Sequence, residues 1–233
     1  MLRVQEDDWD YQYQLRIKTM TTLDDISAAL QKGRAKEVKE LVQQALDQGL
    51  GARAILEEGL LAGMDIIGGK FKRNEVFVPE VLIAARAMNA GAALLKPHLV
   101  EAGVDATGKV IIGTVKGDLH DIGKNLVRMM MEGKGLEVID LGVDVSAEKF
   151  IQAVNDHNAD IVALSALLTT TMNEMKVVVE ALNAAGLRDK VKVMIGGAPI
   201  TESFCVSIGA DAYTADAASA SDTAIALIKK KVA

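Results

Sequence analysis

The chain has 233 residues and a net charge of −6. Nucleic acids and anionic membranes are bound by clustered Lys and Arg, so the acidic balance argues against both as the main partner. The single cysteine excludes a disulfide framework and a cysteine metal cage, and we find neither a long apolar run nor a signal peptide. We therefore expect a cytoplasmic protein that has neither nucleic acid nor membrane as a partner.

Residues 1–19 differ from the segment that follows them. They contain the only tryptophan, Trp9, and two of the three tyrosines, whereas Met20 opens a regular apolar pattern. We interpret 1–19 as an N-terminal extension that is disordered or left by cloning, and we assign it no function.

Residues 20–99 carry apolar side chains at helical spacing in four segments, as is typical of a small helical bundle. Glycine and proline mark the expected helix boundaries. These boundaries are Gly33, Gly49, Gly68 with Gly69, Pro79 and Pro97. Residues 100–108 are predicted to form a linker.

Residues 109–233 show a different pattern, in which short runs of β-branched residues alternate with helical stretches. The expected strands are 109–115, 136–142, 160–166, 192–197 and 211–215. Strands and helices that alternate at this length predict a doubly wound α/β domain with a parallel sheet, of the Rossmann or flavodoxin-like kind.

Unusual residues follow three of these strands. "GDLHDIG" (117–123) follows the first, "SALLTTT" (165–171) ends the third and "GGAPIT" (196–201) ends the fourth. Ligands of such sheets bind at the carboxyl ends of the strands, so we expect the three loops to meet at one rim. Their small residues leave room, and His120 offers a strong ligand atom.

Several common kinds of site do not fit these loops. The glycines do not form G-x-G-x-x-G or a P-loop, no nucleophile elbow is present, and a single histidine is too little for zinc. One protein ligand suits a metal whose other positions are filled by a macrocycle, with Asp118 holding the second ring nitrogen. From Asp118 and His120 alone, a capped helix start with a surface histidine remains the alternative.

The three motifs together are more specific. "DLHDIG" (118–123), "SAL" (165–167) and "GG" (196–197) resemble, in order and spacing, the cobalamin-binding signature of B12-dependent methyltransferases and mutases. The preceding helical segment resembles the cap of methionine synthase and of the small corrinoid proteins in methanogen and acetogen methyl-transfer systems. The resemblance covers residues 20–230, and makes 20–99 a cap domain and 109–233 a cobalamin-binding domain.

The resemblance also implies roles for individual residues. His120 would be the axial ligand of cobalt in the base-off, His-on mode. Asp118 would accept a hydrogen bond from His120, and Ser165 would extend that relay. The other residues implied at the cofactor are Asp121, Ile122, Gly123, Leu167, Thr169, Gly196, Gly197, Ala198 and Tyr213, with Phe77, Val78 and Met88 above the corrin. For the last three, a place in the bundle core is the alternative.

The function implied by the resemblance is that of a methyl carrier without catalysis of its own. It would bind cobalamin, as Co(I) corrinoid or methylcobalamin. A donor-specific methyltransferase (for a methyl ether, methylamine, betaine or methanol) would load it, and a second methyltransferase, of the tetrahydrofolate or coenzyme M type, would unload it. A reductive activator would be a further partner. The alternatives are a cobalamin-dependent sensor or regulator, and the small subunit of a B12 mutase.

Overall fold

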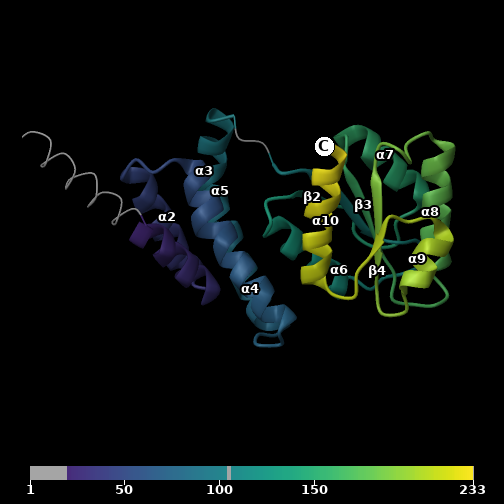
Figure 1. The fold of residues 1–233 in the computed structure, drawn as a ribbon, viewed down its shortest axis with the longest axis horizontal. Helices are drawn as coiled ribbons and strands as arrows, with labels where there is room; N and C mark the ends of the chain where they lie inside the picture. The colour runs from purple at the N-terminus through teal and green to yellow at the C-terminus, as the bar shows by residue number, and fades with distance from the viewer. Residues whose placement is uncertain (1–19, 104–105, 233) are drawn as a thin grey trace, which may run out of the picture. The chain divides into compact units, whose positions relative to one another are not determined.

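The computed structural model describes residues 20–103 and 106–232 (Figure 1). The chain divides into two compact units, one ending at Asp105 and the other beginning at Ala106. The first is helical and the second is built on a parallel sheet. The predicted extension, residues 1–19, lies outside the described residues.

The helical unit has four helical segments within its described residues. They are 20–31, α2 (Ala35–Asp47), a continuous stretch made of α3 (Ala52–Ala54), a π-helical part (Ile55–Leu61) and α4 (Ala62–Lys72), and α5 (Val78–Glu101). The predicted number of segments is confirmed. Gly33 and Gly49 follow the first two helices with φ of +68° and +81°, a left-handed conformation that glycine adopts without strain.

Small residues let these helices approach one another. A Cβ atom on Gly63 would lie 3.1 Å from Leu30 Cδ2, and one on Gly91 would lie 3.0 Å from both Leu60 Cδ2 and Val38 Cγ1. Such distances are tighter than ordinary van der Waals contact. Glycine inside these helices therefore serves close packing of the apolar core.

Two predicted helix ends are wrong. Gly68 and Gly69 do not end the third segment, because α4 continues to Lys72 and buries Gly68 within the unit. A glycine inside a helix costs about 1 kcal/mol relative to alanine, which tertiary packing can offset. α5 likewise continues past Pro97 to Glu101, so the predicted linker at 100–108 begins inside a helix. Pro97 lies in the last turns, where it removes only one backbone hydrogen bond.

The second unit alternates strand and helix throughout. Its elements are β1 (Lys109–Thr114), α6 (Ile122–Glu132), β2 (Glu137–Asp140), α7 (Ala147–His157), β3 (Ile161–Ser165), α8 (Asn173–Ala184), β4 (Lys192–Gly196), α9 (Glu202–Ile208), β5 (Ala212–Tyr213) and α10 (Ala217–Val232). All strand pairs are parallel, in the order β2-β1-β3-β4-β5. The predicted doubly wound sheet is confirmed.

The sheet has a separate apolar core on each face. Val110, Ile112 and Met131 belong to the face covered by α6 and α10, whereas Ile111 and Phe150 belong to the face covered by α7, α8 and α9 (Figure 1). Alternate residues of β1 thus point to opposite faces, and both are buried. The order reverses between β1 and β3, which makes their carboxyl ends the topological switch point.

Two further sequence observations concern Cys205 and the most apolar helix. Cys205 is buried among apolar residues, and burial raises the pKa of its thiol. Among the described residues, one helix, α5, is long and apolar enough by composition to cross a membrane. Its buried side chains, including Val81, Met88 and Leu95, belong to the helical core, and core helices commonly meet the same criterion.

Candidate functional site

The carboxyl ends of three strands lie in register at the switch point. Thr114 of β1 pairs with Ser165 of β3, which pairs with Gly196 of β4. The loops that follow these residues therefore start side by side. This arrangement confirms that the three motifs predicted from the sequence share one rim of the sheet.

His120 lies in the first of these loops, where Asp118 orients it. The side chain of His120 is 51 % exposed, while that of Asp118 is fully buried, and His120 Nδ1 lies 2.8 Å from Asp118 Oδ1. The backbone N–H of His120 donates to the same oxygen at 3.1 Å. Asp118 therefore holds both the main chain and the ring of His120.

The second oxygen of Asp118 fixes the neighbouring loop. Oδ2 accepts hydrogen bonds from the backbone N–H of Leu167 (2.8 Å), the N–H of Leu168 (3.2 Å) and the hydroxyl of Thr171 (2.8 Å). Burial alone would raise the pKa of Asp118. The hydrogen bonds from the backbone of His120 and Leu167, from Thr171 and from the ring of His120 instead hold this pKa far below its usual range.

An ionised Asp118 decides which nitrogen of His120 carries the proton. A carboxylate only accepts hydrogen bonds, so Nδ1 must be the protonated nitrogen. Nε2 is then left with a free lone pair on a half-exposed ring. This is the form in which neutral imidazole binds a metal.

The sequence predicts a relay from Asp118 to Ser165, but another hydroxyl donates to Asp118 in this structure. The hydroxyl that donates to Asp118 belongs to Thr171, six residues farther along the chain. Ser165 ends β3, whereas the turn after Leu167 brings the buried Thr171 back over the carboxylate. The three consecutive threonines at 169–171 indicate that a hydroxyl could reach Asp118. The sequence alone does not tell which of the three does so.

The glycines of the three motifs differ in their surroundings. A Cβ atom on Gly123 would meet nothing within 4 Å, and one on Gly196 would lie 3.8 Å from Thr214 O. A Cβ atom on Gly197 would lie 1.8 Å from Ala166 O, and its φ is +135°. The fold itself requires Gly197, but it leaves open space beside Gly123 and Gly196 that side chains would fill.

Exposed apolar side chains flank His120. Leu119 is 70 % and Ile122 80 % exposed, and Leu167 and Leu168 on the next loop are about 40 % exposed. Large apolar side chains gathered around one polar ligand atom indicate a surface that a large, partly apolar molecule covers. Leu119 and Leu168 were not among the predicted site residues.

The remaining predicted residues of this unit lie at or near the same rim. Asp121 precedes α6 and accepts a hydrogen bond from Asn125, and Thr169 and Ala198 are exposed. Tyr213 is partly buried on β5, where it pairs with Ile195 and packs against the core. Tyr213 is thus the least free of these side chains to contact a ligand.

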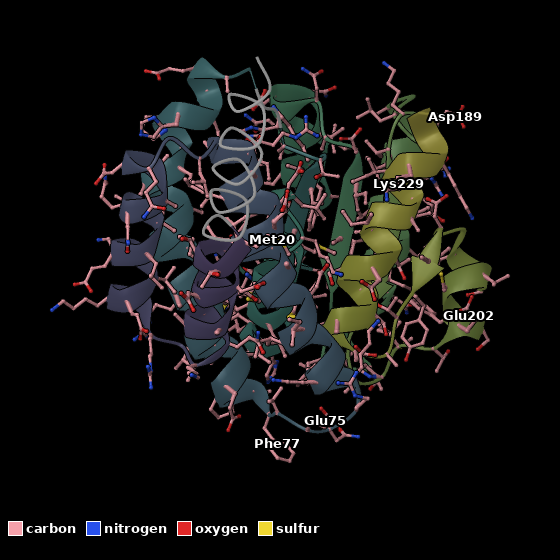
Figure 2. All side chains as sticks on the ribbon, turned by 60° about the vertical axis from the view of Figure 1, so that its left-hand side comes forward. Met20, Glu75, Phe77, Asp189, Glu202 and Lys229 are labelled. Atoms are coloured by element: carbon pink, nitrogen blue, oxygen red, sulfur yellow. The ribbon has the colours of Figure 1, made fainter. Side chains whose placement is uncertain are left out.

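The three predicted residues of the helical unit have different environments. Met88 is 4 % exposed within the core of the bundle, which favours the alternative that it is a core residue. Val78 begins α5 and is partly exposed. Phe77 is 63 % exposed, and Figure 2 shows its ring projecting from the loop before α5, where its N–H donates to Glu80 Oε2.

The donor set fits a corrinoid. A cobalt macrocycle needs one axial protein nitrogen, an apolar surrounding and room for its tail. His120 Nε2, the exposed apolar side chains and the space beside Gly123 and Gly196 meet these needs. Among the described residues, no group of three or more His, Cys, Asp or Glu could hold a metal ion by itself.

Comparison with known proteins agrees with this geometry. A family model described as a B12 binding domain matches residues 108–224, and a second model, also described as a B12 binding domain, matches residues 22–96. Each model thus falls within one of the two units.

Similar proteins match over most of the chain. A corrinoid protein of Desulfitobacterium hafniense (strain Y51) is 39 % identical and covers 91 % of this chain and 97 % of its own. The dimethylamine corrinoid protein of Methanosarcina barkeri is 43 % identical over 85 % and 93 %. The crystal structure of the methanol:cobalamin methyltransferase complex MtaBC from Methanosarcina barkeri matches with a TM-score of 0.81 and 30 % identity, over 90 % of this chain and 80 % of the matched chain.

Proposed function

The chain belongs to the family of corrinoid proteins with B12-binding domains, and we propose that it carries methyl groups between two methyltransferases on a bound cobalamin. One observation carries the proposal: His120 presents Nε2 at the rim while its Nδ1 is held by the buried, ionised Asp118. When bound, the corrinoid supplies a cobalt atom that accepts a methyl group and gives it up again.

The rim residues hold the cofactor in this proposal. His120 would hold the cobalt, and Leu119, Ile122 and Leu167 would supply apolar contact to the macrocycle. The space beside Gly123 and Gly196 would take the nucleotide tail. Asp121, Thr169, Gly197, Ala198 and Tyr213 line the same region.

Asp118 controls the ligand strength of His120. Its negative charge makes the imidazole a stronger electron donor, and its hydrogen bond keeps the proton on Nδ1. Thr171 and the amides of Leu167 and Leu168 stabilise that charge in turn. The protonation state of the Asp118–His120 pair is thereby linked to whether His120 is bound to cobalt.

The helical unit serves as the cap in this proposal. Phe77 and Val78 are its two remaining candidates for contact with the cofactor, since Met88 is part of the core. A cap that excludes water must also move aside for each partner enzyme. The residues between Glu101 and Lys109 connect the two units in the chain.

A methylated amine is the first donor to test. The dimethylamine and trimethylamine corrinoid proteins among the relatives are 40 to 43 % identical to this chain. Among the solved structures, the monomethylamine corrinoid protein of Methanosarcina barkeri is 35 % identical, and the chain matched in the methanol complex is 30 % identical. Methyl ethers and betaines are the next donors. A reductive activator and a cytoplasmic location complete the proposal.

The test follows a labelled methyl group. The corrinoid-loaded chain is mixed with a methylamine methyltransferase and with an acceptor methyltransferase that uses coenzyme M or tetrahydrofolate, each separately and both together. We expect labelled product only when both enzymes are present. Turnover of the donor by the loaded chain alone would contradict the carrier role.

The two alternative functions, a cobalamin-dependent sensor or regulator and the small subunit of a B12 mutase, predict different results with the same loaded protein. A sensor would bind DNA in a manner that changes with illumination, as measured by mobility shift. A mutase subunit would support an isomerisation with adenosylcobalamin. Either result, without methyl transfer, would replace the proposal.

A further inference from the structure

The loop that carries His120 is held at a second point by Thr114. Thr114 is the last residue of β1 and is fully buried, and its hydroxyl donates to the carbonyl oxygen of His120 at 2.9 Å. The N–H of His120 already donates to Asp118 Oδ1. Both main-chain polar groups of His120 are therefore bound to buried side chains.

Asp144, on the loop after β2, holds the same loop from the other side. Asp144 Oδ1 accepts a hydrogen bond from the N–H of Gly117 at 2.7 Å, and the N–H of Asp144 donates to the carbonyl oxygen of Asp118 at 3.0 Å. These two bonds bracket the turn that leads into His120. They connect it to the loop after β2, which carries none of the three motifs.

The backbone of Asp144 is in the left-handed region, with φ of +54°. This conformation is unfavourable for a non-glycine residue, although aspartate and asparagine tolerate it best. A residue keeps such an unfavourable backbone conformation where several contacts with its surroundings hold it in place. The paired hydrogen bonds to Gly117 and Asp118 are contacts of that kind.

We propose that Thr114 and Asp144 are positioning residues that fix the His120 loop in the geometry that ligates cobalt. The inference rests on the proposed function. Their side chains act on the main chain of the loop, at His120 and at Gly117. With the main chain fixed at Gly117, Asp118 and His120, and with Nδ1 held by Asp118, the imidazole needs no further ordering when it binds.

Loss of either contact should lower the population of the competent loop. Apparent affinity falls in proportion to the fraction of molecules in the competent conformation. Each variant leaves one main-chain polar group of the loop without its side-chain partner, so we expect the ratio of His-on to His-off protein to fall about tenfold, or about 1.4 kcal/mol. The remaining contacts at the rim should keep total corrinoid binding nearly unchanged.

The experiment uses the full chain loaded with cob(II)alamin. An axial imidazole nitrogen splits the electron paramagnetic resonance lines of Co(II), so the splitting measures the His-on fraction directly. Thr114→Val removes the hydroxyl at nearly constant shape, and Thr114→Ser restores it. Asp144→Gly removes the acceptor and relieves the left-handed backbone, whereas Asp144→Asn keeps an oxygen acceptor.

Ser221→Ala is the matched control. Ser221 is also fully buried in the sheet unit, and its hydroxyl donates to Ala218 O at 2.8 Å within α10. This variant loses a comparable hydrogen bond away from the loop. We expect it to change stability without changing the nitrogen splitting.

The outcomes separate this inference from the proposed function. A tenfold lower His-on ratio in Thr114→Val and Asp144→Gly, with near wild-type ratios in Thr114→Ser and Asp144→Asn, supports it. Wild-type ratios in the first two variants, with splitting abolished in His120→Ala, would overturn the positioning role alone. If wild type itself shows no splitting, the axial ligand and the proposed function fail together. If Thr114→Val does not fold, the His-on ratio of Asp144→Gly decides whether the loop contacts position His120.

Discussion

The loops after β1 and β4 share one rim but are fixed by different means. Polar side chains hold the loop after β1, with Asp118, Thr171, Thr114 and Asp144 each contributing a hydrogen bond. The loop after β4 is fixed by the lack of a side chain, because Gly197 lies directly against the carbonyl of Ala166. The first arrangement positions a ligand atom, and the second keeps space clear.

This difference predicts graded effects in the first loop and an all-or-none effect in the second. Removing one hydrogen bond of several weakens a loop without displacing it. Adding a methyl group where no space exists displaces a backbone. The following substitutions test this contrast through the free energy of unfolding.

Gly197→Ala should have the largest effect. Its Cβ atom would lie 1.8 Å from Ala166 O in a backbone conformation of φ +135°, so β3 and β4 must separate at their ends. We expect a loss of more than about 3 kcal/mol in urea unfolding. Gly196→Ala is the control, since its nearest contact would be at 3.8 Å, and it should change stability by less than about 0.5 kcal/mol while reducing corrinoid uptake. Equal losses in both variants would refute the distinction.

Asp118→Asn should be next. Both oxygens of Asp118 accept hydrogen bonds, and asparagine replaces one of them with an NH2 group. That NH2 group then faces another donor, either the N–H of His120 or the N–H of Leu167. An unsatisfied buried contact of this kind costs about 2 kcal/mol. Urea unfolding of the cofactor-free chain measures it, with the exposed Asp121→Asn as a control expected within about 0.5 kcal/mol. A neutral result for Asp118→Asn would mean that the two loops do not depend on this carboxylate.

Thr171→Val should cost less, about 1 kcal/mol, because it removes one donor of several from Asp118. Ser165→Ala should leave stability within about 0.5 kcal/mol, since the Asp118 contacts remain in place. The same pair, loaded with corrinoid, should differ in the His-on fraction. A larger effect of Ser165→Ala in both measurements would restore the relay predicted from the sequence.

His120→Ala should affect stability least. The side chain is half exposed, and Asp118 keeps its other donors, so we expect a change below about 0.5 kcal/mol. Its effect should appear in the visible spectrum of the loaded protein, which loses the axial nitrogen. An unchanged cobalt spectrum would contradict the ligand assignment.

Short-range patterns predicted most of the fold. The β-branched runs gave the strands to within about two residues, and glycines with φ above +60° ended the first two helices where expected. The errors at Gly68, Gly69 and Pro97 arose because these residues weaken a helix locally, and packing against neighbouring helices outweighs that penalty. The two alternatives for Met88 stayed open for a related reason: helical spacing shows which residues share a face, but not whether that face meets a neighbouring helix.

The sequence by itself determined the alternation of strands and helices and the chemistry of the three motifs. Those features depend on side-chain type and spacing along the chain. Only the tertiary structure decided that Thr171, and not Ser165, donates to Asp118, and that Asp144 reaches Gly117 from the loop after β2. Such contacts join residues 27 to 53 positions apart, and the turns that bring them within hydrogen-bond distance are fixed by the packed sheet rather than by any local pattern.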